Sequence, residues 1–279
     1  MTNPPATLSP TDYAYIRGLV RERAAIVLED GKEYLVEARL TPVARREGFG
    51  SLEEYLQRLR SQPSGPLHRK AVEAMTINET SFFRDWRPFE VLRKTVLPEV
   101  VAKNTALKSL HIWSAASSSG QEAYSLAILL KEHFPQVLSG WNVKVHGSDV
   151  STEMVERSRT GKYLQLEVNR GMPAPLLVKH FLRTGLDWHV KDDIKKLVEF
   201  QQGNLAGEWP SLPKMDIILL RNVMIYFDTD TKKRILQRMR GLLKPGGLLF
   251  LGAAETTLNL DGAYERLTAE GTSYYRAPL

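Results

Sequence analysis

The chain has 279 residues, 43% of them hydrophobic and 25% charged, a composition that suits a globular protein with one large or two smaller domains. The absence of cysteine excludes disulfides, thiolate zinc sites and cysteine nucleophiles, and no two of the six histidines are four residues apart, so we expect no metal site. The net charge of +6 suits an anionic partner, but acidic residues lie among the basic ones throughout, so we expect no nucleic-acid partner.

No apolar run approaches the roughly 20 residues of a membrane span, so we expect no membrane insertion. The opening residues, 1–5, lack the basic start and the apolar core of a signal peptide. Together with the absence of cysteine, this favours a cytoplasmic protein.

Residues 1–77 carry helical patterns and no strand pattern, which predicts a small all-helical domain. Residues 9–12 supply a capping hydroxyl, a first-turn proline and a carboxylate, which is the pattern of a helix start. The apolar residues that follow at helical spacing end with Val27. A second helix is expected over 33–47, where Pro42 either kinks the helix or opens a new one.

Residues 78–105 are expected to form a linker segment and a helix that lead into a second domain at 106–279. The linker begins with Asn78–Asp85, a cluster that fits neither a helix nor a strand pattern. The helix is expected over 87–103 and broken at Pro98, because proline has no backbone N–H to donate.

Residues 106–279 alternate apolar strands with helical patterns, which predicts a doubly wound, mostly parallel sheet with helices on both faces. The first unit is a strand at 110–116, a turn of small residues at 115–120, and a helix from Glu122. Further strands are expected at 143–147, 198–201, 215–220 and 248–251, helices at 152–160 and 230–243, a tight turn at 244–247, and a final strand pair around Gly271.

Residues 162–197 are too long for one strand connection and predict an insertion into the sheet domain. A helix is expected there over 174–182, followed by a small hairpin near Gly185.

The turn at 115–120 matches a dinucleotide-binding loop poorly, because only Gly120 occupies a glycine position of that motif. A ligand without a pyrophosphate demands a less close backbone approach. Glu122 can face a cationic group such as an ammonium, or it can simply favour the helix dipole. Asp149 follows the second strand, where such sheets bind ribose hydroxyls. The turn and Asp149 together favour an adenosine-containing ligand.

Arg221 and Asn222 directly follow the most apolar strand, at the edge where open α/β sheets place ligands. Buried polar groups need partners, which either a ligand or a capping network for the next helix can supply. A second polar feature is the stretch 38–46, which contains three arginines and no acid. It predicts either a solvated helix face or a contact for an acidic partner.

Five segments carry a resemblance to a known family: Asn78–Arg84, Ser114–Glu122, Gly147–Asp149, Asn204-Leu205 and Arg221–Phe227. In residues, order and spacing they resemble the chemotaxis receptor methyltransferases, the CheR family, over roughly residues 10–276. The resemblance implies an enzyme that transfers a methyl group from S-adenosylmethionine (SAM) to glutamate side chains of chemoreceptors, giving methyl esters in chemotactic adaptation. It implies a class I, Rossmann-like methyltransferase fold with a small β excursion and a receptor-facing helical domain.

The resemblance also implies residue roles. Arg84 and Tyr226 would orient the reacting groups, without acid–base work. The basic residues Arg39, Arg45 and Arg46 would meet the receptor helices. The residues expected to bind the cofactor are Asn78, Thr80, Arg84, Ala115, Glu122, Asp149, Asn204, Leu205, Arg221, Asn222 and Val223.

Some members of the family bind a pentapeptide at the receptor's C-terminus through a glycine-bearing loop of the β excursion. Gly185 alone supplies little of that loop, so we expect this chain to work without the tether. We further expect a monomer, associated with chemoreceptor arrays in the cytoplasm, with S-adenosylhomocysteine as the product and no metal.

Three other functions are weighed against this one. A methyltransferase that acts on RNA would suit the basic balance, but the chain lacks an aromatic-rich basic platform for bases. A non-catalytic scaffold is disfavoured because the site residues are present at every matched position. A dehydrogenase is disfavoured by the poor glycine pattern of the turn at 115–120.

Overall fold

The computed structural model describes residues 8–279. They divide into two compact units, each treated by itself below. The first comprises the chain up to Ile77 together with Tyr226–Thr231, and the second comprises Asn78–Ile225 together with Lys232–Leu279.

The first unit is helical, as predicted. Ser9 caps its first helix, because the Ser9 hydroxyl accepts a hydrogen bond from the Asp12 N–H at 3.1 Å. This helix ends at Ala25, whose backbone is in the left-handed conformation. Val27 therefore lies beyond the helix and is 43% exposed. The prediction that Val27 belongs to the apolar face is wrong. The helices are α1 (Pro10–Ala24), α2 (Glu33–Arg46), α3 (Leu52–Ser61) and α4 (Pro66–Ala74).

Helix α2 continues through Pro42, so no new helix opens there. Pro42 cannot donate to the carbonyl of Ala38, one turn earlier, but Ala38 is exposed and water can hydrate that carbonyl. The opposite face of α2 is buried through Val36, Leu40 and Val43, and this burial holds the helix straight enough to continue.

The second unit begins with the segment 78–86 and a helical stretch that is not broken at Pro98. The stretch consists of α5 (Arg87–Val91), a π-helical turn η1 (Leu92–Val96) and α6 (Leu97–Lys103). In the π turn, the Leu97 N–H donates to the carbonyl of Leu92, five residues back. This wider turn, just before the missing donor of Pro98, lets the chain remain helical.

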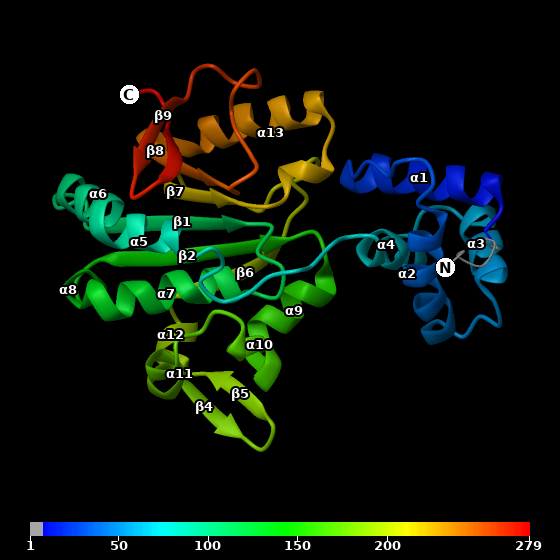
Figure 1. Cartoon of the computed structure of the whole chain (residues 1–279), viewed down its shortest axis with the longest axis horizontal. Coiled ribbons are helices and arrows are strands. Elements are labelled where there is room, and N and C mark those ends of the chain that lie inside the picture. The colour runs from blue at the N-terminus through cyan, green and yellow to red at the C-terminus, as the bar shows by residue number, and fades with distance from the viewer. Residues whose placement is uncertain (1–7) are drawn as a thin grey trace. The chain divides into compact units, whose positions relative to one another are not determined.

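The main sheet has seven strands in the order β6-β2-β1-β7-β8-β10-β9 (Figure 1). The five strands from β6 to β8 are parallel, and the two at the β9 edge are antiparallel to their neighbours. The doubly wound sheet is therefore confirmed. Its strands are β1 (Ser109–Ala115), β2 (Asn142–Asp149), β6 (Val198–Gln202), β7 (Met215–Leu220), β8 (Leu243–Leu251), β9 (Glu265–Ala269) and β10 (Thr272–Arg276).

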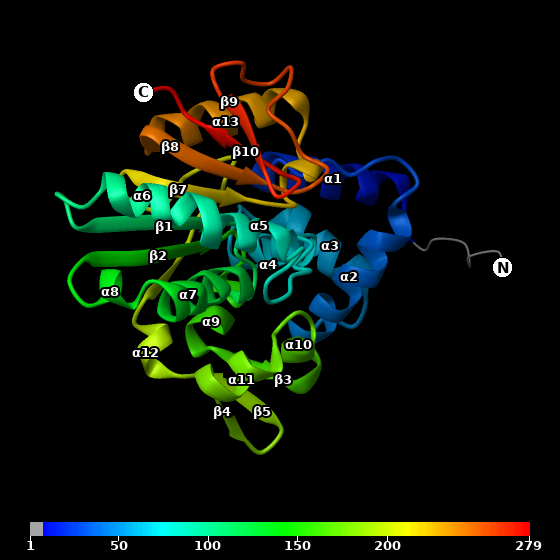
Figure 2. The ribbon, with the colours of Figure 1, turned by 60° about the vertical axis from the view of Figure 1, so that its left-hand side comes forward.

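Helices cover both faces of this sheet (Figure 2). Leu110 and Ile112 of β1 share one buried cluster with residues of α6, α7 and α9. Trp113 points to the other face, where its ring lies 5.0 Å from that of Trp209, and Arg238 of α13 lies 4.0 Å above the Trp209 ring. The helices are α7 (Gln121–His133), α8 (Pro135–Leu138), α9 (Thr152–Thr160) and α13 (Thr229–Leu242).

The tight turn expected at 244–247 is instead a bulge inside β8. Met215 of β7 pairs with Leu243, but Ile217 already pairs with Leu248, so β8 carries the extra residues between these two pairs. Gly246, with a φ of 68°, accommodates the bulge.

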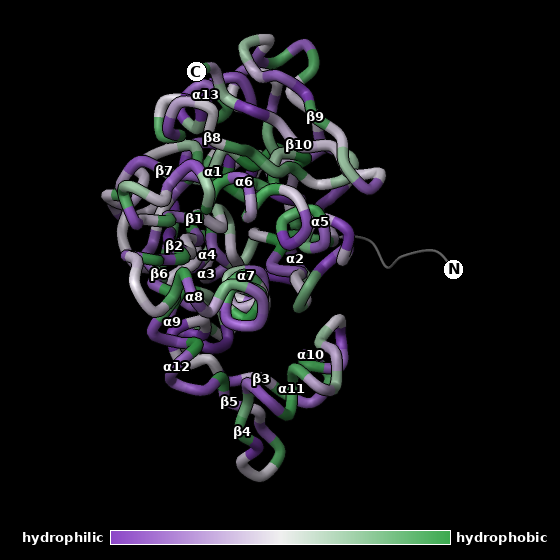
Figure 3. The backbone as a smooth tube through the Cα atoms, turned by 90° about the vertical axis from the view of Figure 1, so that its left-hand side faces the viewer, coloured by the Kyte–Doolittle hydropathy of each residue, from purple (hydrophilic) through white to green (hydrophobic). Residues whose placement is uncertain are grey.

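The insertion at 162–197 folds as predicted into a small antiparallel sheet with short helices. The hairpin turn contains Gly185, whose φ is 61°, and the predicted helix ends at His180 because Phe181 begins a strand. Figure 3 shows green, apolar stretches on this insertion. Its elements are β3 (Lys162–Leu164), α10 (Gln165–Asn169), α11 (Ala174–His180), β4 (Phe181–Thr184), β5 (Asp187–Val190) and α12 (Asp192–Lys195), with the strand order β3-β5-β4.

Candidate functional site

Several predicted cofactor residues of the second unit lie at the carboxyl ends of parallel strands. Ala115, the last residue of β1, pairs with Ser148 of β2 and with Leu220 of β7. The turn after β1 is therefore level with Asp149 and Arg221, which follow these partners. This is the edge at which open α/β sheets bind ligands.

The turn at 115–120 depends on small residues because it packs against two neighbouring elements. Ala116 and Ser118 have positive φ values of 58° and 49°, and Gly120 has 94°. A Cβ added to Gly120 would lie 2.7 Å from the Ser158 Cβ and 3.0 Å from the Phe200 ring. Glycine is thus required at position 120 for the contact with α9 and β6, whatever ligand the turn holds.

Asp149 ties this turn to the start of α9. Its carboxylate is buried and accepts hydrogen bonds from the N–H of Ser118 at 2.8 Å and from the N–H of Ser151 at 3.0 Å. Both bonds favour the charged carboxylate and fix it at the end of β2.

Arg221 is the centre of a buried ion-pair network. Its side chain is 1% exposed and contacts the carboxylates of Asp85, at 2.7 Å, and Glu122, at 2.9 Å. It also donates to the backbone carbonyl of Arg84, at 2.9 Å, and Glu122 accepts from the Ser114 hydroxyl, at 2.8 Å. Two carboxylates around one guanidinium leave a net negative charge, which suits a cationic ligand group.

The segment 78–85 lies against the turn and α7. The Ser118 hydroxyl donates to the carbonyl of Asn78 at 2.8 Å, and the Phe83 N–H donates to the Ser125 hydroxyl at 2.9 Å. Arg84 folds back on the segment and donates to the carbonyl of Glu79 at 2.9 Å. Thr80 is half-buried.

Buried aromatic rings anchor the same segment. The Phe82 ring is fully buried, 4.9 Å from the ring of Tyr163 and 5.5 Å from that of Phe181, both in the insertion. The segment 78–85 is therefore held in place by core packing, and its polar residues are presented from a fixed backbone.

Asn204 and Leu205 lie in a loop after β6 that is held from both sides. The Asn204 carbonyl oxygen Oδ1 accepts from the Ala206 N–H at 3.0 Å. The backbone carbonyl of Leu205 accepts from the Trp209 indole at 2.9 Å, and the Arg238 guanidinium covers the Trp209 ring. Burial lowers the pKa of Arg238.

Asn222 and Val223 belong to a short loop held by Glu255, which the sequence analysis did not single out. The N–H groups of Asn222, Val223 and Met224 donate to the Glu255 carboxylate at 2.8, 2.9 and 2.7 Å. Glu255 follows the end of β8, so the argument that drew attention to Arg221 would also have found Glu255. Asp85 was missed because it lies in a segment without a regular pattern.

Most of the unpartnered buried polar atoms belong to residues of this site. Four buried side-chain N or O atoms in the described range 8–279 have no hydrogen-bond partner. Three belong to the site, namely Ser117 Oγ, Arg221 Nε and Asn222 Oδ1, and the fourth is His146 Nδ1 on β2. Buried polar groups are normally satisfied, so a ligand with donors and acceptors is the expected partner for these three.

The other predicted site residues belong to the first unit. Arg39 is half-buried and donates to the carbonyls of Met75, at 2.8 Å, and Thr76, at 3.0 Å, and burial lowers its pKa. Arg45 and Arg46 are exposed at the end of α2. The carbonyl of Tyr226 accepts from the Val27 N–H at 3.0 Å.

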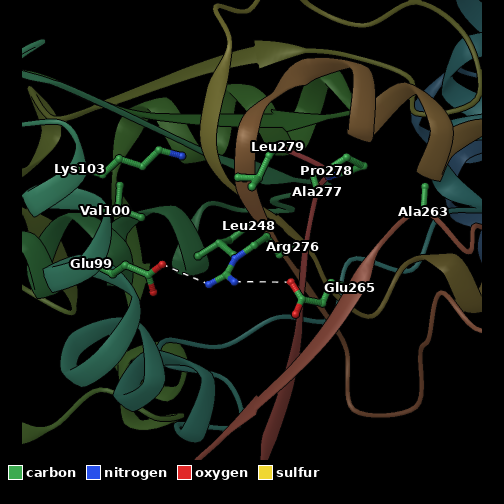
Figure 4. Close-up of a pocket in the computed structure, with 11 residues that line it drawn as sticks. Glu99, Val100, Lys103, Leu248, Ala263, Glu265, Arg276, Ala277, Pro278 and Leu279 are labelled. Carbon is green, nitrogen blue, oxygen red and sulfur yellow. Dashed lines mark hydrogen bonds and ion pairs between the residues drawn. The ribbon is translucent and has the colours of Figure 1, made fainter.

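Hollows in the surface of the second unit differ in their relation to the site. One, of about 650 Å³, reaches Asp85, Arg221 and Glu255 and so adjoins the site. The other, of about 440 Å³, contains Arg276 between Glu99 and Glu265 and includes none of the predicted residues (Figure 4).

Neither a metal site nor a membrane span is found between residues 8 and 279. No cluster of three or more His, Cys, Asp or Glu side chains there could hold a metal ion. No helix of that range is long and apolar enough to cross a bilayer.

Two family descriptions match the chain in succession. "CheR methyltransferase, all-alpha domain" matches residues 11–76, and "CheR methyltransferase, SAM binding domain" matches residues 78–272. The second match alone covers more than half of the chain and contains the site described above.

Relatives match over nearly their whole length. Chemotaxis protein methyltransferase 1 of Pseudomonas aeruginosa is 41% identical, with 95% of this chain and 97% of the relative covered. Chemotaxis protein methyltransferase Cher2 of Pseudomonas putida is 39% identical, with 95% and 98% covered. Chemotaxis protein methyltransferase 1 of Vibrio cholerae is 38% identical, with 97% and 98% covered. The chain therefore belongs to the CheR family of SAM-dependent chemotaxis protein methyltransferases.

Proposed function

We propose that this chain esterifies glutamate side chains on the cytoplasmic helices of chemoreceptors, with SAM as the methyl donor. The observation that supports the donor site is the group of unpartnered buried atoms, Ser117 Oγ, Arg221 Nε and Asn222 Oδ1, at the ligand edge of the sheet. A glutamate acceptor agrees with a site whose predicted residues include no histidine, because a carboxylate is already nucleophilic and needs no general base.

The sulfonium of SAM supplies an electrophilic methyl group, which moves in line to a carboxylate oxygen as the sulfur–carbon bond breaks. In this proposal Asp149 holds the ribose hydroxyls, and Asn204 and Leu205 border the adenine. The net negative charge around Arg221 and Glu122 favours the cationic end of the donor.

The acceptor must be aligned more than it must be activated. The opposite charges of carboxylate and sulfonium cancel in the transition state, so strong stabilisation of either charge would oppose transfer. We therefore assign Arg84 and Tyr226 to orienting the acceptor. Asn78, Thr80 and Ala115 complete the wall of the donor site.

The experiment that tests this function is incubation of the chain with methyl-labelled SAM and either receptor membranes or RNA. We expect label on the receptors only, and we expect base treatment to release it, because a carboxylate ester hydrolyses in base. Base-stable label, or label on RNA, would contradict a glutamate ester as the product.

For the receptor contact, we assign the exposed residues Arg45 and Arg46, with Arg39 as a half-buried support that ties α2 to the carbonyls of Met75 and Thr76. Arginine forks suit the acidic residues that surround methylation sites on receptor helices. The double variant Arg45→Glu/Arg46→Glu should raise the KM for receptor about tenfold, because it replaces attraction by repulsion.

The affinity of this double variant for S-adenosylhomocysteine, measured by calorimetry, should stay within about twofold, since neither arginine is among the residues proposed to bind the cofactor. Arg58→Glu, on the exposed side of α3, is the matched control and should leave both quantities unchanged. An unchanged KM in the double variant would move the receptor contact away from α2.

The insertion supports a mode of action without a receptor tether. Its β4–β5 hairpin turns at Gly185-Leu186, since Thr184 already pairs with Asp187, and so offers no extended glycine loop. Receptors with and without their C-terminal five residues should be methylated at the same initial rate. A rate that falls about tenfold on truncation, a loss of about 1.4 kcal/mol, would contradict this. We also propose that the chain acts as a monomer in the cytoplasm.

A further inference from the structure

Glu255 occupies a concentrated set of backbone hydrogen-bond donors. Its Oε2 accepts from the N–H of Gly252 at 2.7 Å and of Asn222 at 2.8 Å. Its Oε1 accepts from the N–H of Val223 at 2.9 Å and of Met224 at 2.7 Å. One carboxylate therefore joins the loop after β8 to the loop after β7, where two of the proposed cofactor residues lie.

The loop after β7 has a conformation that needs such a partner. Asn222 has a φ of 58°, in the left-handed region that side chains other than glycine seldom adopt. Three successive N–H groups then converge on one point and form a concave anion site, which the Glu255 carboxylate fills. Hydrogen bonds to a charged carboxylate are roughly twice as strong as those between neutral groups.

The backbones of the two loops are in direct contact at Gly252. A Cβ at that position would lie 2.8 Å from the Asn222 nitrogen and 2.7 Å from Glu255 Oε2. The loop after β7 therefore cannot shift towards β8, and the four bonds prevent it from shifting away.

This arrangement sets the direction of the Asn222 side chain. Its Oδ1 is buried and has no partner within the described chain, so it can serve a ligand only if the backbone holds it in place. We propose that Glu255 is a positioning residue for the donor site: it fixes the loop Asn222–Met224 and thereby presents Asn222 and Val223 to SAM. This inference rests on the proposed cofactor role of those two residues.

The test is Glu255→Gln, which keeps the shape of the side chain but turns one acceptor oxygen into a donor facing two N–H groups. Hydrogen exchange at the amides of Asn222–Met224 should rise in the ligand-free protein. The affinity for S-adenosylhomocysteine, measured by calorimetry, should fall about ten- to a hundredfold, since at least two charge-assisted bonds are lost. The matched control is Glu265→Gln, whose carboxylate is 61% exposed, and it should change neither quantity.

A double-mutant cycle with Asn222→Gly separates positioning from general stabilisation. If Glu255 acts through the Asn222 side chain and its left-handed backbone, Glu255→Gln should matter less once position 222 is glycine. The loss of affinity in the Asn222→Gly background, in decades, should be at most about a third of the loss in the wild-type background. Equal losses in both backgrounds would show that Glu255 only stabilises the fold, and would overturn the inference.

The exchange measurement does not depend on the proposed function. Unchanged hydrogen exchange at Asn222–Met224 in the Glu255→Gln variant would show that Glu255 does not fix this loop, even if the chain binds SAM. Faster exchange with unchanged cofactor affinity would overturn the positioning role and leave the proposed function intact. Failure of the wild-type chain to bind S-adenosylhomocysteine would instead overturn the proposed donor site.

Discussion

Arg221→Met should lower the free energy of unfolding of the second unit by about 3 kcal/mol, because removing one partner of a buried ion pair leaves the other charge uncompensated. Arg221 is 1% exposed and Glu122 only 12%, so the largely buried Glu122 would lose its counter-charge. Asp85, at 47% exposure, would be solvated and should contribute less to the loss.

Urea unfolding followed by tryptophan fluorescence measures this loss selectively. All five tryptophans, at 86, 113, 141, 188 and 209, lie in the second unit. The double variant Glu122→Gln/Arg221→Met should recover at least half of the lost stability, because it removes the uncompensated carboxylate. If Arg221→Met lowered the free energy of unfolding by less than about 1 kcal/mol, the ion pairs of Arg221 would contribute no more than solvated surface pairs do.

Asp149→Ala should weaken the binding of S-adenosylhomocysteine at least about a hundredfold, since under the proposed function it removes two charge-assisted hydrogen bonds to ribose hydroxyls. The variant also removes the acceptor for the N–H groups of Ser118 and Ser151, so some loss of stability is expected as well. Calorimetry of the folded variant, below its unfolding temperature, separates the two effects.

Asp149→Asn provides a graded comparison, because it keeps one acceptor oxygen at the same place. Its affinity should fall less than that of the alanine variant, by about tenfold, as expected when one charge-assisted bond is lost. The exposed Asp192 of α12 supplies the control Asp192→Ala, which should bind as the wild type does. Unchanged affinity in Asp149→Ala would falsify the ribose assignment.

Local signals in the sequence predicted most of the elements. Helix α9 begins at the cap Ser151, whose side chain forms a short-range hydrogen bond with the backbone. It ends at Gly161, because glycine readily adopts the left-handed conformation. The mostly apolar run at 215–220 became β7 with its expected bounds, because a strand buried on both faces is largely apolar. Its one charged residue, the buried Asp216, is paired with Lys244. These features depend on residues within one or two turns of each other.

The departures arose where a long-range contact overrides a local preference. Pro98 was expected to break a helix, and the opening of a new helix was one of two alternatives for Pro42. Neither occurs, because burial of the surrounding apolar residues outweighs one missing hydrogen bond. Lys244–Gly247 has the composition of a turn, yet pairing with β7 draws it into β8 as a bulge. Arg39 looked like a surface charge, and only the fold reveals the two carbonyls that hold it.

The same division applies to the site. The sequence by itself determined which residue types reach the ligand edge, because the carboxyl ends of parallel strands meet there. The order of its motifs also indicated the family. Only the tertiary structure decided the partners: Arg221 meets Asp85 and Glu122 across 136 and 99 positions of sequence, and Glu255 reaches Asn222 across 33. Ion pairs, and hydrogen bonds from a side chain to the backbone of a distant loop, leave no periodic pattern in a sequence. Each such contact joins two single residues, and folding alone brings them together.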